Sequence, residues 1–573
     1  MPCPYCEQDS GRPDNLARHI ERRHKDQLFV AAADGDEAAV KRLLENGADV
    51  EIRNTRNETS LLLASRNGHD GVVRLLLDHK ANIESTDSLG HTPLSRAVLH
   101  GHEGVVRVFL EKNANFMAVS LSGNYTPIEI LAVQSGHEDI FKLLIEKGAS
   151  PNVAANNGRT PLSLAADLGH VSIIAWLLDQ GVDIEARSGD RKWTPLMWAT
   201  HGGHAASVEL LIDRGAFLEK GGALPKRRKT KKGQRPLHIA VKNGNLDVVL
   251  ILLAAGADTE VMESHPSGCT PLHCAILRGH MDIARALIGK GADLEATNSD
   301  GETPLASAAR HGQMDAVRIL VEAGAKFGSE EDGPDALSSA IKGSGDKEII
   351  DYLLENDPDV KSRLPLHCAI NISATEPLLL VLQRGFDVNS RNDYDHTPLH
   401  LAARNSPKDT IQLLLEHGAS MDAKNRAGRT PLHLAAARGS EVPVQLQSLL
   451  ENGSDVNWTD NGGRTPLHLA STRKATQLLI EYGADVSSKD NGGQTPLHTT
   501  FTREAVQLLI EHGADVSSRD NSGQTPLHSA EQKRHGTADA AQCLVEHGAD
   551  VNSRDSKGQT PLHLAARSWS IPV

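Results

Sequence analysis

The stretch "RTPLHLAAARG", residues 429–439, decides how most of this chain folds. Thr430 is a candidate helix N-cap, and Pro431 takes the first helical position, where its missing N–H group costs nothing. Gly439 is expected to end the helix. One helix face then carries apolar side chains at the spacing i, i+3 and i+4, namely Leu432, Ala435 and Ala436.

A second helix is expected after each such stretch. It is clearest in "AVQLLIEHGAD", residues 505–515, where Gly513 supplies the C-terminal stop. The segment "VSSRDNSGQ", residues 516–524, then reverses the chain before the next Thr-Pro pair. The predicted unit is therefore helix, turn, helix and projecting loop.

This unit recurs along the chain. The first four Thr-Pro pairs are 34 residues apart, most later ones are 30 to 35 apart, and Pro-Leu-His at Pro236 and Pro365 fills two gaps. One unit cannot bury its apolar face alone, but stacked units share a continuous core. The Thr-Pro pairs begin at Thr92, Thr126, Thr160, Thr194, Thr270, Thr303, Thr397, Thr430, Thr465, Thr495, Thr525 and Thr560.

These motifs resemble the ankyrin repeat family over more than nine-tenths of the chain. The resemblance implies a mostly α-helical ankyrin-repeat solenoid of about 16 repeats from near Gln27, ending in a partial one. It also implies protein partners held by the loop tips and first helices. We expect the first array at 27–327, a degenerate repeat or hinge at 328–363, and the second array, with a truncated last repeat, at 364–573.

Composition limits the class of protein. The 573 residues carry a net charge of −14 and only 3% aromatic side chains, which suits small leucine and alanine interiors. The sequence has no apolar run long enough for a transmembrane helix and no apolar N-terminal signal segment. Its six cysteines are too scattered for a disulfide framework. We therefore expect an intracellular protein, in nucleus or cytoplasm, with no membrane partner.

The N-terminal segment 1–26 predicts a zinc site, with the spacing Cys3-x2-Cys6-x12-His19-x4-His24. Two thiolates and two imidazoles suit tetrahedral Zn²⁺. The segment resembles a small ββα C2H2 zinc finger.

The finger resemblance maps the base-reading positions onto Arg12, Asn15 and Arg18, which would favour roughly G-A-G. A single finger covers about three base pairs, too few to specify a genomic site. Two interpretations stay open: the finger contacts DNA, or it caps the solenoid or contacts protein.

A basic segment interrupts the repeats in the loop at 220–233. It resembles a nuclear localisation signal read by an importin, and the alternatives are an electrostatic patch for nucleic acid or acidic lipid and a merely solvated loop. Its basic residues are Lys226, Arg227, Arg228, Lys229, Lys231 and Lys232.

A partner-binding row is predicted at the residue before Thr-Pro. His91, Tyr125, Arg159 and Trp193 follow one another at 34 residues, so a constant repeat stacks them on one face. Tyrosine, arginine and tryptophan dominate binding hot spots. The alternative is that Trp193 covers the loop of its neighbour.

The histidines do not indicate an enzyme. Most follow Thr-Pro-Leu, and one histidine at the same place in every unit is a repeat feature, which in the family fixes the loop by hydrogen bonds. The adjacent pairs His273-Cys274 and His367-Cys368 point in different directions on a helix. No phosphate-binding, esterase or zinc-protease motif is present.

The leading hypothesis is a scaffold or adaptor that binds a protein on its ankyrin surface. The alternative is a nuclear, DNA-associated regulator whose finger and basic loop contact nucleic acid while the repeats recruit a partner. A third hypothesis, a severed regulatory part of a larger enzyme, rests on the abrupt end at Val573.

Overall fold

A computed structural model describes residues 26–115, 119–121, 124–219, 234–263, 268–328, 333–360, 364–371, 375–438, 444–532 and 538–568. The chain divides into two compact units, unit 1 over Met1–Asp300 and unit 2 over Gly301–Val573. Within each unit the helices come in pairs, and each pair is one repeat. We name the helix at the Thr-Pro position the first helix and the one after it the second helix.

Unit 1 contains eight helix pairs in its described part. Its first helices are α2 (Gln27–Asp34), α4 (Ser60–Asn67), α6 (Pro93–Leu99), α8 (Ile128–Gln134), α10 (Pro161–Leu168), α12 (Pro195–Gly202), α14 (Pro236–Asn243) and α16 (Pro271–Arg278). Its second helices are α3 (Glu37–Glu45), α5 (Asp70–Asp78), α7 (Glu103–Glu111), α9 (Glu138–Glu146), α11 (Val171–Asp179), α13 (Ala205–Asp213), α15 (Leu246–Ala254) and α17 (Met281–Gly289). One projecting loop forms an antiparallel hairpin of β1 (Val119–Leu121) and β2 (Asn124–Thr126).

Unit 2 contains eight further pairs and a last helix without a partner among the described residues. Its first helices are α18 (Pro304–Arg310), α20 (Ala336–Lys342), α22 (Pro365–Asn371), α24 (Pro398–Asn405), α26 (Pro431–Ala436), α28 (Pro466–Leu469), α30 (Pro496–Thr499), α32 (Pro526–Gln532) and α34 (Pro561–Ser568). Its second helices are α19 (Met314–Glu322), α21 (Lys347–Asn356), α23 (Thr375–Gln383), α25 (Lys408–Glu416), α27 (Val444–Glu451), α29 (Arg473–Glu481), α31 (Arg503–Glu511) and α33 (Ala538–Glu546). The sixteen helix pairs of the described residues agree with the expected number of about 16 repeats, and the truncation of the last repeat stays a prediction.

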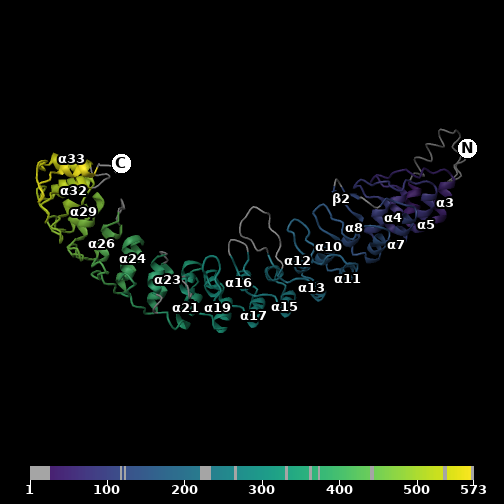
Figure 1. Ribbon diagram of the computed structural model, residues 1–573, viewed down its shortest axis with the longest axis horizontal. Helices are drawn as coiled ribbons and strands as arrows, with labels where there is room; N and C mark the ends of the chain where they lie inside the picture. The colour runs from purple at the N-terminus through teal and green to yellow at the C-terminus, as the bar shows by residue number, and fades with distance from the viewer. Residues whose placement is uncertain are drawn as a thin grey trace. The chain divides into compact units, whose positions relative to one another are not determined.

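The helices of each unit lie in two layers. First helices contact first helices, as α10 contacts α12, while second helices contact second helices, as α11 contacts α13. In Figure 1 the second helices α11, α13, α15 and α17 follow one edge of unit 1. The core lies between the layers, and each repeat packs only on its neighbours.

The opening stretch folds as its pattern predicts. Leu432, Ala435 and Ala436 are buried on one face of α26. The helix ends at Ala436, before the expected stop at Gly439, which lies outside the described residues. After α31, Gly513 adopts a positive φ of 91°, which a residue with a side chain rarely adopts.

The segment at 328–363 keeps the helix pair despite lacking Thr-Pro. Asp335 replaces threonine as the cap of α20, where its carboxylate accepts a hydrogen bond from the Ser338 amide at 2.7 Å. Helix α20 contacts α18 and α22, as any first helix would. This segment is therefore a repeat in its described part, and its role as a hinge stays a prediction.

Candidate protein-binding surface

The repeated histidines bridge consecutive repeats. The Nδ1 atom of His433 accepts a hydrogen bond from the Thr430 amide at 3.2 Å, and its Nε2 lies 3.0 Å from the Arg464 carbonyl in the next loop. Burial lowers the pKa of His433, so the ring is neutral at neutral pH and Nε2 donates to that carbonyl. The same bridge occurs at His400, His468, His498 and His528. The prediction that these histidines fix the loops is confirmed.

The predicted partner row is not an exposed row. His91 is buried, with its ring 3.2 Å from the Asp87 carboxylate. Trp193 is 4% exposed and packs on the rings of Trp198 and His201, at centroid distances of 4.8 and 5.4 Å. Neither side chain is exposed, because each packs against its own repeat, and partner binding by these two residues stays a prediction.

The other two members of that row are Arg159 and Tyr125. Arg159 is half-buried, with its guanidinium 3.8 Å from the centre of a Trp198 ring and 2.9 Å from the Asp167 carboxylate. Tyr125 belongs to β2, and its side chain lies outside the described residues. The structure therefore gives this row no common outward face.

An internal pairing recurs at this position in several repeats. The residue before the Thr-Pro position meets the residue eight positions later, at the far end of the first helix. The carboxylate of Glu58 lies 2.9 Å from Arg66, and Arg159 pairs with Asp167 in the same way. In unit 2, Glu302 pairs with Arg310 at 2.6 Å. In these three repeats the charge at this position is thus neutralised within its own repeat.

The ends of the first helices form a second candidate protein-binding surface, which was not predicted from the sequence. In unit 1 this end row, as we name it, carries an exposed side chain in six repeats: Asn67, Gln134, Leu168, His201, Asn243 and Arg278.

Contacts between helices join part of the end row into one strip. The Asn243 side-chain amide donates to the His201 carbonyl at 3.0 Å, and the His201 ring lies 3.1 Å from the Asp167 carboxylate. The sequence carries a signal for the end row: the residue before the glycine that ends most first helices varies from repeat to repeat, as in Asn67-Gly68 and Leu168-Gly169.

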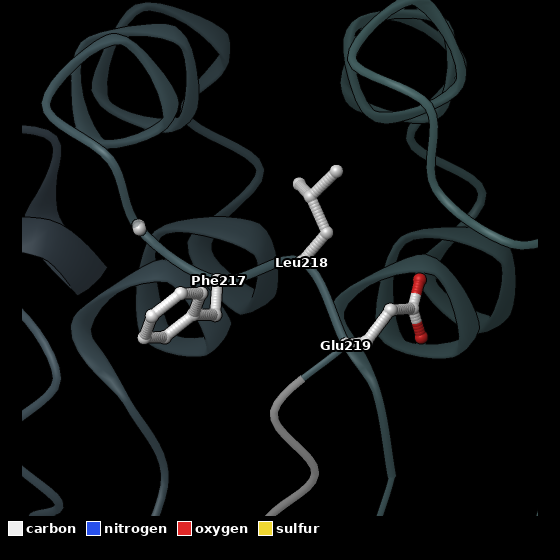
Figure 2. A pocket seen from close by; sticks show the side chains of 4 residues that line it. Phe217, Leu218 and Glu219 are labelled. Atoms are coloured by element: carbon white, nitrogen blue, oxygen red, sulfur yellow. The ribbon is translucent and has the colours of Figure 1, made fainter.

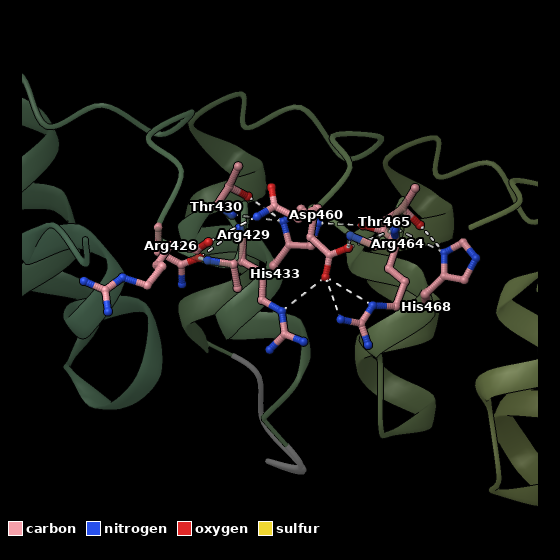
Figure 3. A network of polar contacts seen from close by, with 12 residues as sticks. Arg426, Arg429, Thr430, His433, Asp460, Arg464, Thr465 and His468 are labelled. Atoms are coloured by element: carbon pink, nitrogen blue, oxygen red, sulfur yellow. Dashed lines mark hydrogen bonds and ion pairs between the residues drawn. The ribbon is translucent and has the colours of Figure 1, made fainter. Parts of the chain in front are cut away.

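Unit 2 places arginines around one buried carboxylate. The Asp460 side chain is 0% exposed, and its Oδ2 lies 3.3 Å from Arg429 Nε and 3.0 Å from Arg464 Nη2. Figure 3 shows both guanidinium groups directed toward this carboxylate from neighbouring repeats. Burial alone would raise the pKa of Asp460, but hydrogen bonds from the Arg464 backbone and side chain outweigh it and lower the pKa.

An open depression lies beside the basic loop. It has a volume of about 500 Å³ and is lined by Ala216, Phe217, Leu218 and Glu219. Figure 2 shows the Phe217 and Leu218 side chains pointing in different directions from the backbone. Phe217 is 62% exposed. The predicted import signal, Lys226 to Lys232, follows within 220–233, outside the described residues.

The remaining site predictions also fall outside the described residues. The zinc ligands Cys3, Cys6, His19 and His24 and the DNA-contact candidates Arg12, Asn15 and Arg18 all lie within 1–25. Elsewhere, in the part of the chain that the structure describes, no three His, Cys, Asp or Glu side chains group as metal ligands. No helix in that part is long and apolar enough to cross a bilayer.

The described cysteines next to histidines are poorly suited to nucleophilic chemistry. Burial raises the pKa of the Cys368 thiol to about 11. A hydrogen bond with Cys269, together with burial, raises the pKa of the Cys274 thiol. The thiolate is the reactive form, so both groups are unreactive near neutral pH.

Comparisons with known proteins agree with this architecture. A protein of Schizosaccharomyces pombe named as ankyrin repeat-containing is 39% identical over 65 residues, which are 11% of this chain and 31% of that protein. The family described as "Ankyrin repeats (3 copies)" matches nine segments, most of them overlapping, along most of the chain: residues 28–120, 122–188, 185–263, 237–331, 371–446, 399–490, 441–520, 473–555 and 502–572. The chain belongs to the ankyrin repeat family.

Proposed function

We propose that the chain is a protein-interaction scaffold whose partner binds along the first-helix ends. The observation that carries this proposal is the end row of unit 1, where a fixed frame presents a different exposed side chain from repeat to repeat. Stacked repeats supply extended surfaces of this kind, and ankyrin repeats generally bind proteins.

The chemistry of the end row suits a polypeptide ligand. Asn67, Gln134 and Asn243 supply amide donors and acceptors, while Leu168, 41% exposed, adds an apolar contact. Peptide backbones need hydrogen-bond partners, and apolar anchors supply much of the binding free energy. The end row provides both along one face.

A matched pair of leucines tests the assignment. Leu168 lies in the end row, whereas Leu250, 45% exposed, lies on the second helix α15. The tagged full-length chain, Leu168→Gln and Leu250→Gln would each be expressed, and co-purifying proteins would be quantified by mass spectrometry. We expect Leu168→Gln to reduce recovery of a specific partner roughly tenfold and Leu250→Gln to leave it unchanged.

Two results would count against the proposal. Equal loss from both variants, with unchanged circular dichroism, would remove the end row as the binding face. The absence of any protein enriched by the full-length chain would remove the scaffold function itself.

We also propose that Cys3, Cys6, His19 and His24 hold one Zn²⁺ ion, which would supply folding stability to the N-terminal segment. The support is the donor set and its spacing. Elemental analysis of the purified full-length chain should find one zinc per chain, and the Cys3→Ser/Cys6→Ser variant should lack it. Full zinc content in that variant would contradict the assignment.

The DNA-associated alternative has its own measurement. The zinc-loaded full-length chain would be titrated against duplexes with and without GAG at two salt concentrations, beside a variant with alanine at Arg12, Asn15 and Arg18. Binding that prefers GAG and is lost in the variant would favour a DNA-associated regulator. Binding indifferent to the variant would leave the finger as a structural element.

A further inference from the structure

In one part of unit 2, the residue before Thr-Pro has no oppositely charged residue eight positions later. Arg429 has Ala437 eight positions later, where Arg159 has Asp167. His396 has Arg404 at that place, and Arg464 has Thr472. Three consecutive repeats, those of α24, α26 and α28, therefore lack the internal carboxylate that neutralises an arginine at α10.

Four arginines lie at the ends of the first helices α24, α26 and α28, each of which contacts the next, and we name them the arginine patch: Arg404, Arg429, Arg438 and Arg464. Arg404 is exposed, and its guanidinium has no hydrogen bond or ion pair with any described residue. Arg438 is exposed and donates to the side chain of Asn405, the neighbour of Arg404. These two guanidiniums have no carboxylate partner among the described residues.

The other two members of the patch share one carboxylate. Arg429 uses only its Nε on Asp460, which leaves both terminal nitrogens without a described partner. Arg464 contacts the same Oδ2 through Nε and Nη2. Their side chains are 28% and 36% exposed, so donor groups remain accessible to solvent.

We propose that the arginine patch binds an acidic segment of a protein partner, whose Asp or Glu carboxylates supply the missing counter-charges. This proposal rests on the proposed scaffold function and names the chemistry of one partner. The guanidinium fork matches a carboxylate with two parallel hydrogen bonds. A short acidic segment also suits a chain of net charge −14, which repels a long polyanion.

The test uses the full-length chain and fluorescein-labelled peptides followed by fluorescence anisotropy. One peptide carries Glu at every second position, and the other carries Gln at those positions. We expect the Glu peptide to bind roughly tenfold more tightly than the Gln peptide, with an affinity that falls as salt rises.

Two variants locate the binding. Arg404→Glu/Arg438→Glu should weaken the Glu peptide roughly tenfold or more, because attraction becomes repulsion. Ala437→Asp places a carboxylate eight positions after Arg429, as Asp167 follows Arg159, and should compete internally for that guanidinium. We expect Ala437→Asp to weaken binding and Ala437→Asn to leave it unchanged.

The control reverses two charges away from the patch. Arg318 and Lys347 are exposed on the second helices α19 and α21 of the same unit, outside the three repeats of the patch, so Arg318→Glu/Lys347→Glu changes the net charge by the same amount. Equal weakening by patch and control variants, or equal binding of the Glu and Gln peptides, would overturn the proposal.

A single-stranded oligonucleotide serves as the competitor. If it binds more tightly than the Glu peptide and loses affinity in the patch variant, the patch is a nucleic-acid site and the peptide proposal fails. Either failure would leave the scaffold function standing, because that function is tested at Leu168 in unit 1.

Discussion

His433 holds two loops at once, since one ring nitrogen meets Thr430 and the other meets the carbonyl of Arg464. The ring is buried, so water cannot replace either bond. We expect His433→Ala to lower the free energy of unfolding by about 1 to 3 kcal/mol, because it leaves a buried donor and acceptor unsatisfied. Urea denaturation of the full-length chain measures this loss.

An exposed histidine in the same part of unit 2 provides the comparison. His417 follows α25, and its Nδ1 lies 2.9 Å from the Leu413 carbonyl of its own helix. His417→Ala should cost less than about 0.5 kcal/mol, as surface changes usually do. Equal costs at the two positions would show that the bridge between repeats adds no stability.

His400 makes folding sensitive to acid. Burial lowers its pKa from 6.5 to about 4, so the unfolded chain takes up a proton at a higher pH than the folded chain. Its contribution is complete above pH 6.5 and falls as pH decreases from there toward 4. At about pH 5 the loss should be about 2 kcal/mol from this ring alone.

Urea midpoints between neutral pH and about pH 5 check this expectation. His400→Gln removes the titrating group, so its stability should change less with pH than that of the unchanged chain. Burial also lowers the pKa of His367 and His468, which adds to the same trend. A His400→Gln chain with an unaltered pH slope would contradict the assignment.

At the scale of the element, two first helices in unit 2 are unusually short. Helices α28 and α30 have four residues each, whereas α24 has eight. The sequence reason is the spacing of 30 residues from Thr465 to Thr495 and from Thr495 to Thr525. Fewer intrahelical hydrogen bonds hold these segments, which lowers the free energy of opening them locally.

We therefore expect backbone amides of α28 and α30 to exchange with deuterium roughly tenfold faster than those of α24. Hydrogen-exchange mass spectrometry of the full-length chain resolves the three segments. The second helix α31, with nine residues, provides a reference of ordinary length in the same repeats. Equal protection in α24, α28 and α30 would show that stacking compensates for helix length.

At the scale of the whole molecule, repeats contact only their neighbours within each unit. A destabilising core substitution should therefore affect only its own repeat and the adjacent ones. Leu76 is fully buried in α5, and Leu76→Ala should cost about 2 to 5 kcal/mol there. We expect faster hydrogen exchange in α4 to α7 and unchanged exchange in α14 to α17 of the same unit.

The comparison variant has the same chemistry at a distant repeat. Leu252 is fully buried in α15, so Leu252→Ala should reverse the pattern along unit 1. Loss of protection across the entire unit from either variant would contradict neighbour-limited stability.

The sequence by itself determined the repeat and its helix pairs, while the family resemblance implied that histidines such as His433 fix the loops. These features depend on local rules: a cap at Thr430, a proline at the first turn and apolar spacing along one helix. The same pattern recurs in most repeats, so each occurrence supports the prediction made from the others. Even the segment without Thr-Pro kept its helix pair, because Asp335 caps α20 as threonine does elsewhere.

Only the tertiary structure decided which side chains are exposed. Trp193 and His91 occupy positions that the repeat period placed in one row, yet both are buried. Periodicity fixes where a residue sits along the stack, whereas exposure depends on the partners that side chain meets. The Asp460 carboxylate lies four residues before Arg464 in the same loop, whereas Arg429 meets it only once the repeats are stacked.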